Sequence, residues 1–240
     1  MRRSIGVLAV LAVIVGTATV VGQSKPDRRI GHDARYPIAS QLRPDERHVI
    51  VEFNGTPPLV ILRDPPKGES RLEWLAKQWD VILVATVERI DPVLIFRDRE
   101  FREAEVPAEH ASWIVSTVQA RVEDVIKGAG EFGRTVGDRV SLKVEGGTAM
   151  IRGTLVEAVV PWEPAMVQGR KYLLFGRMYN GEFVKNHGYA ESSTAWLTRM
   201  TRPIPGSLDA LGRPAEIADI DDAEQWTLDQ AVGLLREALR

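Results

Sequence analysis

The sequence predicts a mainly β protein whose central strands form a five- to six-stranded, partly closed barrel. At least five consecutive segments between residues 80 and 190 have the alternation or the β-branched composition of strands. Turn signals, mostly glycines, separate these segments. Helical spacing is confined to a short segment before the barrel and to an amphipathic C-terminal segment. Consecutive strands with turns between them are typical of a closed or nearly closed barrel.

The chain opens with the pattern of a secretory signal peptide, residues 1–22. Arg2 and Arg3 form a cationic head, and residues 5–21 are apolar apart from a few glycines and threonines. This run is at the lower limit of the ~20 residues that a membrane-spanning helix needs. We therefore expect cleavage between Gly22 and Gln23, and a secreted or periplasmic protein. Retention of the segment as an uncleaved anchor is the alternative.

The composition of the remaining chain restricts its compartment and its ligands. Removing residues 1–22 from the 240 leaves 218, and removing Arg2 and Arg3 from the 31 basic residues leaves 29 against 33 acidic ones, a net charge of −4. This balance disfavours nucleic-acid binding. The absence of cysteine excludes disulfides, thiolate metal sites and cysteine nucleophiles. An exported chain of this size without cysteine is typical of a bacterial envelope or secreted protein.

Two segments are predicted to precede the barrel. Residues 23–48 are polar and lack an apolar period, which favours a linker or a loose arm. Residues 49–79 are predicted to form a hairpin and a short helix. The hairpin signal is Asn54-Gly55 between two β-prone runs. The helix is expected to begin after an N-cap at Ser70 and to end at Asp80, because the intervening apolar residues have helical spacing.

The barrel is assigned to residues 80–195. Its first strand is apolar on both faces and is expected to end at Asp91-Pro92. Residues 93–112 are interpreted as a long hairpin arm or a solvated loop. The next strand begins at Ile114, and a change of phase predicts a bulge near Glu123-Asp124.

The later barrel strands follow from clearer signals. One strand places Val140, Leu142 and Val144 inward and ends at Gly146-Gly147. Two further β-prone runs follow it, and Asn180-Gly181 predicts a second hairpin.

Residues 196–240 are predicted to be irregular at first and helical at the end. Thr227 and Gln230 have the spacing of a capping box. The apolar stripe of this helix, which ends at Leu239, is expected to pack on the barrel; contact with a partner helix is the alternative.

The order of strands and turns resembles a known module. The strand that ends in Val122-Glu123-Asp124-Val125-Ile126-Lys127-Gly128 is followed by Gly137-Asp138-Arg139-Val140, by Gly146-Gly147 and by Gly169-Arg170-Lys171-Tyr172-Leu173-Leu174-Phe175. Across residues 80–190 the chain is similar to the cysteine-free, netrin- or TIMP-like OB-fold modules of exported bacterial proteins. The resemblance implies an OB-like barrel that binds something or merely packs, and it does not imply an enzyme. The metalloprotease inhibition of animal members depends on an N-terminal cysteine, so it carries over to no residue of this chain.

No catalytic, metal or nucleotide motif stands out in the sequence. The histidines, His32, His48, His110 and His187, are isolated and lack the spacing of zinc ligands, so no metal or cofactor is expected. A binding surface is predicted from the residue types that dominate interface energetics and from the histidine that follows the second hairpin: Arg152, Trp162, Glu163, Tyr179 and His187. The alternative is that the tryptophan covers one end of the barrel.

The sequence therefore favours an exported, non-enzymatic binding or interaction module with a protein or glycan partner, which contacts a membrane only through its signal segment if that segment is retained. A secreted or periplasmic hydrolase is the second interpretation. Its acid and base would be separated carboxylates such as Glu145, Glu163 or Glu182. A purely structural envelope protein is the third.

Overall fold

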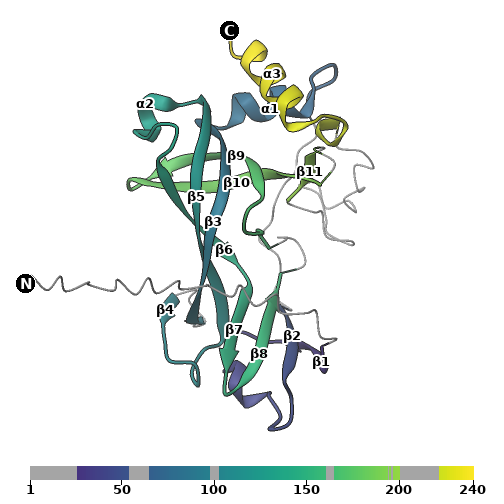
Figure 1. Ribbon diagram of the computed structural model, residues 1–240, viewed down its shortest axis with the longest axis vertical. Helices are drawn as coiled ribbons and strands as arrows, with labels where there is room; N and C mark the ends of the chain where they lie inside the picture. The colour runs from purple at the N-terminus through teal and green to yellow at the C-terminus, as the bar shows by residue number, and fades with distance from the viewer. Residues whose placement is uncertain are drawn as a thin grey trace, which may run out of the picture.

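Two β-sheets and a pair of helices make up the molecule (Figure 1). The computed structural model describes residues 26–53, 65–97, 103–160, 165–193, 195, 197–200 and 222–240. The predicted signal segment with its Gly22–Gln23 cleavage site and most of the segment predicted to be irregular lie outside these ranges. The described chain is mainly β and ends in a helix, as the sequence predicts.

The larger sheet has seven strands, all antiparallel to their neighbours. Its hydrogen-bonded order is β11-β10-β9-β3-β5-β6, with β4 paired to the far end of β3. The β3–β4 pairing agrees with the hairpin-arm interpretation of residues 93–112. The strands are β3 (Val81–Arg97), β4 (Glu103–Glu105), β5 (Trp113–Lys127), β6 (Arg139–Glu145), β9 (Lys171–Tyr179), β10 (Glu182–Glu191) and β11 (Leu197–Arg199).

The larger sheet curls around an apolar core but is not a closed barrel. Val140, Leu142 and Val144 are 0%, 1% and 3% exposed, which confirms that they face inward. They share a cluster with apolar side chains of β3, β5, β9 and β10. Among the described strands, β6 is paired only with β5, and the path ends at β6 and β11. The prediction of a mainly β fold is therefore confirmed, and the larger sheet is antiparallel but is not a closed barrel.

β-Bulges contribute to the curl. Val84 pairs with Asp124 and Ala85 with Val122, so Glu123 is an extra residue in β5, at the predicted position. A second shift between Ile82 and Leu83 lies one step further along the same pair of strands. Because a bulge increases the local twist, these irregularities bend the long β3–β5 ribbon.

Strand β3 continues to Arg97, so the prediction that it ends at Asp91-Pro92 was wrong. Proline lacks the N–H group that a strand between two partners must donate. β9 pairs with residues 81–86 of β3, and β4 pairs with residues 95–97. Pro92 lies between these stretches, where β5 is the paired neighbour among the described strands. Such an edge position accepts proline.

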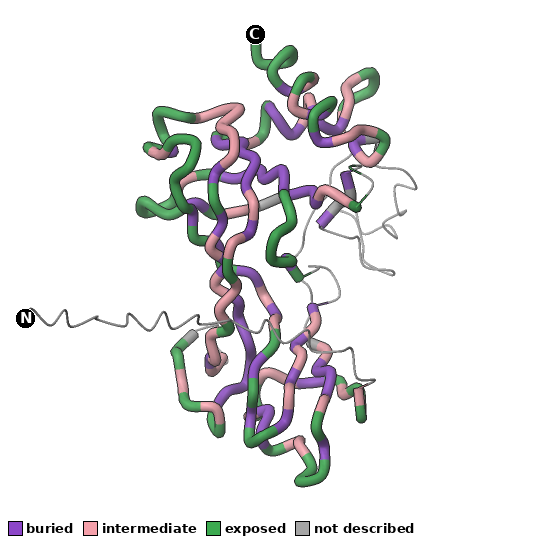
Figure 2. The backbone as a smooth tube through the Cα atoms, viewed as in Figure 1, coloured by how far each residue is buried: buried purple, intermediate pink, exposed green. Residues whose placement is uncertain are grey.

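The smaller sheet has four strands in the order β1-β2-β8-β7. They are β1 (Arg28–His32), β2 (His48–Phe53), β7 (Gly147–Ile151) and β8 (Thr154–Val159). β2 is parallel to both β1 and β8, whereas β7 and β8 form an antiparallel hairpin. Figure 2 shows buried residues in this sheet as well as in the larger one. A separate apolar cluster lies here, around Trp113 at the start of β5.

The smaller sheet corrects one prediction about the N-terminal part of the chain. Residues 28–48 are not a loose arm: they contain β1 and a 3-10 turn, η1 (Ile38–Ser40), whose Ile38 is fully buried. β1 and β8 occupy both sides of β2. The predicted hairpin turn, Asn54-Gly55, and its second run, residues 59–62, lie outside the described residues. This sheet could not be predicted from local composition, because β2 pairs with β8, which lies about a hundred residues later in the sequence.

The two sheets meet at Gly146-Gly147, where the chain leaves β6 and enters β7. Gly146 has φ +84° and Gly147 has φ +133°, conformations that favour glycine. A Cβ on Gly146 would lie 2.6 Å from the Ala158 carbonyl oxygen, and one on Gly147 would lie 2.1 Å from Ser116 Oγ. Only glycines allow the strand to change sheets at this point.

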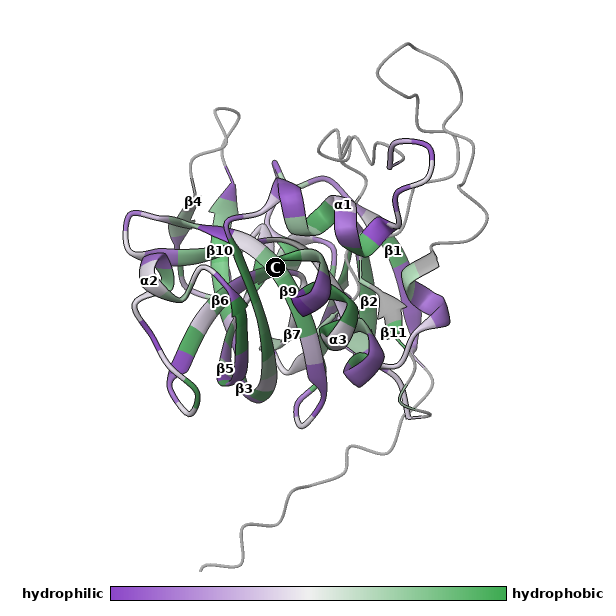
Figure 3. Cartoon of the chain, turned by 90° about the horizontal axis from the view of Figure 1, so that it is seen from above, coloured by the Kyte–Doolittle hydropathy of each residue, from purple (hydrophilic) through white to green (hydrophobic). Residues whose placement is uncertain are grey.

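Two helices cover the outer face of the larger sheet (Figure 3). Helix α1 (Arg71–Gln78) begins with a capping box between Ser70 and Glu73, and α3 (Leu228–Ala238) begins with one between Thr227 and Gln230, so both predicted N-caps are confirmed. Their apolar sides pack on each other and on β3 and β9. The other short elements are α2 (Ala129–Phe132) and η2 (Asp222–Gln225). No helix among the described residues has the length and apolar character needed to span a membrane.

Candidate functional site

A cavity of about 270 Å³ lies where the two sheets meet. Its inner wall is formed by buried apolar side chains, namely Val118, Val144 and Met166. Its outer wall includes the exposed residues Pro92 and Thr148. Strands β3, β5, β6 and β7 all contribute, because β6 turns away from the larger sheet at this point. The cavity is therefore a product of the Gly146-Gly147 crossover.

Two polar side chains of this cavity, Ser116 and Glu145, are already paired. Ser116 Oγ donates a hydrogen bond to the Gly146 carbonyl oxygen at 2.8 Å. The Glu145 carboxylate forms an ion pair with Arg97, and the side chains are 31% and 13% exposed. The Arg97 guanidinium also lies over the Trp113 ring, 5.9 Å from its centroid. An apolar ligand fits this lining better than a highly polar one, since unpaired polar groups would lose their hydration.

The residues predicted to form a binding surface are not brought together where the structure describes them. Arg152 lies in the β7–β8 turn and donates to the Ala39 carbonyl oxygen at 3.3 Å. Tyr179 is 64% exposed and ends β9, in the other sheet. The backbone of His187 lies within β10, paired with Phe175. Trp162 and Glu163 lie outside the described residues, immediately before the cavity residues Ala165 and Met166.

The carboxylates considered for a hydrolase are separated. Glu145 ends β6 beside the cavity, whereas Glu182 begins β10 on the β9–β10 hairpin. The neighbour of Glu182, Phe183, packs edge-on against Phe132 of α2. Glu182 lies on a different strand from Glu145 and does not line the cavity. Glu163 lies outside the described residues.

No metal site is formed by the part of the chain that the structure describes: no three histidine, aspartate or glutamate side chains converge there. His48 Nε2 lies 3.4 Å from Glu157 Oε2, and His110 is exposed in a turn. His32 differs from both because it is fully buried.

His32 is held by three different contacts. Its Nε2 lies 2.6 Å from the Ser112 carbonyl oxygen, and its Nδ1 lies 2.8 Å from Gln41 Nε2. Since the carbonyl oxygen needs a donor and the amide nitrogen is one, the ring is neutral with its proton on Nε2. The ring also stacks on Trp113, with an interplanar angle of 3°. Burial lowers the pKa of His32 below its ordinary value of 6.5, although its hydrogen bonds act in the opposite direction.

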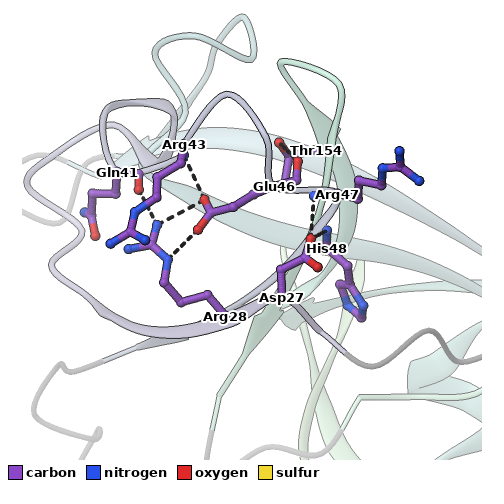
Figure 4. Close-up of polar contacts among 8 residues, drawn as sticks. All are labelled: Asp27, Arg28, Gln41, Arg43, Glu46, Arg47, His48 and Thr154. Atoms are coloured by element: carbon purple, nitrogen blue, oxygen red, sulfur yellow. Dashed lines mark hydrogen bonds and ion pairs between the residues drawn. The ribbon is translucent and has the colours of Figure 1, made fainter.

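Charged residues hold the two ends of the segment around His32 together (Figure 4). The Asp27 carboxylate accepts hydrogen bonds from the backbone N–H groups of Arg47 and His48, at 2.6 and 3.0 Å. Glu46 accepts one from the backbone N–H of Arg43 at 2.7 Å and pairs with Arg28 at 2.6 Å. We call residues 26–47 the N-terminal clasp. Sequence reasoning missed it, because polar residues without a period also fit a loose arm.

The clasp is fastened to the hairpin of the smaller sheet. Thr154 Oγ donates to the Glu46 carbonyl oxygen at 2.9 Å, and the Leu155 N–H donates to the Arg47 carbonyl oxygen at 2.8 Å. Each of these polar groups is satisfied within the protein. The clasp therefore closes the smaller sheet. The polar groups in these contacts are all used within the protein, so none of them is available to a ligand.

No protein-family model and no curated protein matches the chain. The cavity between the sheets is therefore the candidate site on structural grounds alone.

Proposed function

We propose that this protein is an exported, non-enzymatic binding module in which the curled sheet is an OB-like barrel and the cavity between the sheets is the ligand site. The cavity carries the proposal. Its inner wall is apolar, and its carboxylate, Glu145, is paired with Arg97. Small-molecule and side-chain sites share this composition, an apolar hollow with a few fixed polar groups.

The expected partner is a protein that inserts an apolar side chain into the cavity. A glycan would need several hydrogen-bonding groups that are free to turn toward it, and Ser116 and Glu145 are both engaged inside the protein. An apolar side chain requires no such groups. The exposed Thr148 and Pro92 beside the cavity would then contact the surface around that side chain.

The cavity has too few titratable groups among its described residues for a hydrolase. Acid–base hydrolysis uses two titratable groups that converge on the substrate. Among the described lining residues, Glu145 is the one carboxylate, and Glu182 does not line the cavity. The netrin- or TIMP-like resemblance and the signal-peptide pattern support an exported module of this kind.

Site-specific photo-crosslinking in cells that export the chain tests the proposal. A photoreactive amino acid at Thr148, beside the cavity, should give a discrete adduct with one protein. The same amino acid at Lys143, which is exposed on β6 and does not line the cavity, serves as the matched control. Equal adducts at both positions would contradict the proposal. So would a hydrolytic activity of the pure protein that Glu145→Gln abolishes.

A further inference from the structure

The buried titratable side chains of this protein are concentrated in one segment. The buried polar or charged residues among those described are His32, Glu46, Arg71, Ser112, Ser116 and Thr154. Of these, only His32 and Glu46 change charge as the pH falls below neutral, since arginine stays protonated and the others do not ionise. Both belong to the N-terminal clasp.

We propose that the clasp is acid-labile: protonation of His32, followed at lower pH by protonation of Glu46 and Asp27, releases β1 and η1 from the smaller sheet while the larger sheet stays folded. This inference is independent of the cavity and of the proposed binding function.

Protonation of His32 adds a charge to a fully buried ring. Nδ1, which accepts from Gln41 in the neutral ring, becomes a donor, so the Gln41 amide must turn its oxygen toward the ring to keep the contact. The nearest charged side chains do little to stabilise the protonated ring. Asp33 is engaged by Arg35, and Arg97 lies over the Trp113 ring against which His32 stacks. A buried imidazolium without a carboxylate partner is unfavourable.

The two carboxylates of the clasp act in the same direction at lower pH. Backbone N–H groups of His48 and Arg47 lower the pKa of Asp27 below 3.8. The backbone N–H of Arg43 lowers the pKa of Glu46 below 4.5, and Arg28 adds to this effect. Protonation of either carboxylate would weaken the hydrogen bonds that close the clasp. The imidazole of His48 faces Glu157 of β8, outside these contacts.

The sign of the pH dependence follows from these shifts. A group whose pKa is lower in the folded clasp than in the open chain favours the closed form above the open-chain pKa, and that contribution is lost as the pH falls. For His32 the loss begins near 6.5. A single group of this kind changes the opening equilibrium by up to about tenfold per pH unit. The carboxylates extend the loss below pH 4.5.

Opening the clasp would have a defined structural consequence. β1 covers one edge of β2, and Ile38 is buried in the apolar cluster around Trp113. Release of both would expose the backbone groups of β2 and part of this cluster. Unpaired strand edges are templates for β-pairing with another chain.

Hydrogen exchange of the purified full chain, followed by mass spectrometry, tests the inference. Between pH 7.5 and 5.5, after correction for intrinsic exchange, the amides of β1 should exchange up to about tenfold faster. The amides of β9 should not change. His32→Gln retains a donor toward Ser112 but cannot be protonated, so it should lose the pH step; His110→Gln, at an exposed histidine, should retain it.

A second variant keeps the test decisive if His32→Gln does not fold. Gln41→Glu places a carboxylate against Nδ1, which stabilises the protonated ring, so the pH step of the β1 amides should shrink or reverse. Parallel acceleration of β1 and β9 would overturn the inference, and so would an unchanged step in both variants.

Discussion

In the larger sheet, the apolar side chains on the outer face are covered by helices α1 and α3, whereas the edge of the smaller sheet is covered by the N-terminal clasp. The helices contribute leucines and alanines to one apolar cluster. The clasp contributes Ile38 and Ala39, but it is fastened by His32, Glu46 and Asp27. Apolar packing does not depend on pH, whereas contacts between ionisable groups do. Carboxylates of the larger-sheet half, such as Glu73 and Glu88, also have lowered pKa values, but the buried histidine among the described residues is His32 of the clasp. We therefore expect the clasp to respond to falling pH before the larger sheet does.

Truncation of one buried residue in each half gives the largest expected effects. Leu174→Ala in β9 should lower the free energy of unfolding by about 3 kcal/mol, because it leaves a cavity in the packed sheet. Ile38→Ala should instead act mainly on the clasp, seen as faster exchange of the β1 amides with a smaller change in global unfolding. Denaturant unfolding and hydrogen exchange measure the two effects. Leu239→Ala, at a position that is 37% exposed, is the control.

If Ile38→Ala and Leu174→Ala lowered the global stability equally, with no extra exchange at β1, the clasp would be part of one cooperative unit. The comparison between the two halves would then fail.

The crossover between the sheets should be the next most sensitive point. Gly146→Ala and Gly153→Ala impose nearly the same backbone strain, because φ is +84° and +80°. A Cβ at Gly146 meets the Ala158 carbonyl oxygen, whereas nothing lies within 4 Å at Gly153. We expect Gly153→Ala to cost about 1 kcal/mol and Gly146→Ala about 1–3 kcal/mol more. Equal losses in thermal unfolding would show that the crossover is not tightly packed.

The cap of α1 should have a smaller effect. Ser70→Ala removes the side chain that accepts from the Glu73 N–H, and such losses cost about 1 kcal/mol. The loss should appear in denaturant unfolding of the larger sheet and leave the exchange of the clasp unchanged. Ser70→Asp, which retains a capping oxygen, should restore most of the stability. A change confined to the clasp would contradict the assignment of α1 to the larger sheet.

Exposed ion pairs of the larger sheet should contribute least. Arg139 pairs with Glu88 on the solvent face, and its side chain is 70% exposed. Arg139→Met should therefore leave the unfolding midpoint unchanged within error. Arg28→Met removes the partner of the buried Glu46, so it should open the clasp measurably by hydrogen exchange. A larger effect for Arg139→Met than for Arg28→Met would contradict the claim that ion pairs matter more in the clasp than in the larger sheet.

The sequence was sufficient to predict elements with a local cause. Both helix N-caps follow from a serine or threonine with a partner three residues later, and the inward face of β6 follows from strict alternation. The bulge at Glu123 follows from a change of phase. Each of these signals lies within about one turn or one strand of the residue that it predicts.

The smaller sheet and the cavity could not be predicted in the same way. His32 contacts the Ser112 carbonyl oxygen 80 residues away, and Thr154 contacts the Glu46 carbonyl oxygen 108 residues away. The cavity is formed by four strands that meet where β6 changes sheets. Pro92 was misinterpreted as a strand end because only the sheet order reveals the edge on which it lies. Partners of this kind are specified by tertiary packing rather than by local propensity.

An acid titration that observes both halves at once is the most direct test. With 5-fluorotryptophan incorporated, Trp113 reports on the clasp because it stacks on His32, and Trp79 reports on the helix-covered sheet. Tryptophan-to-phenylalanine variants assign the fluorine signals. We expect the Trp113 signal to change as the pH falls below about 6.5, while the Trp79 signal stays constant until stronger acid. A single transition in which both signals change together would contradict the account.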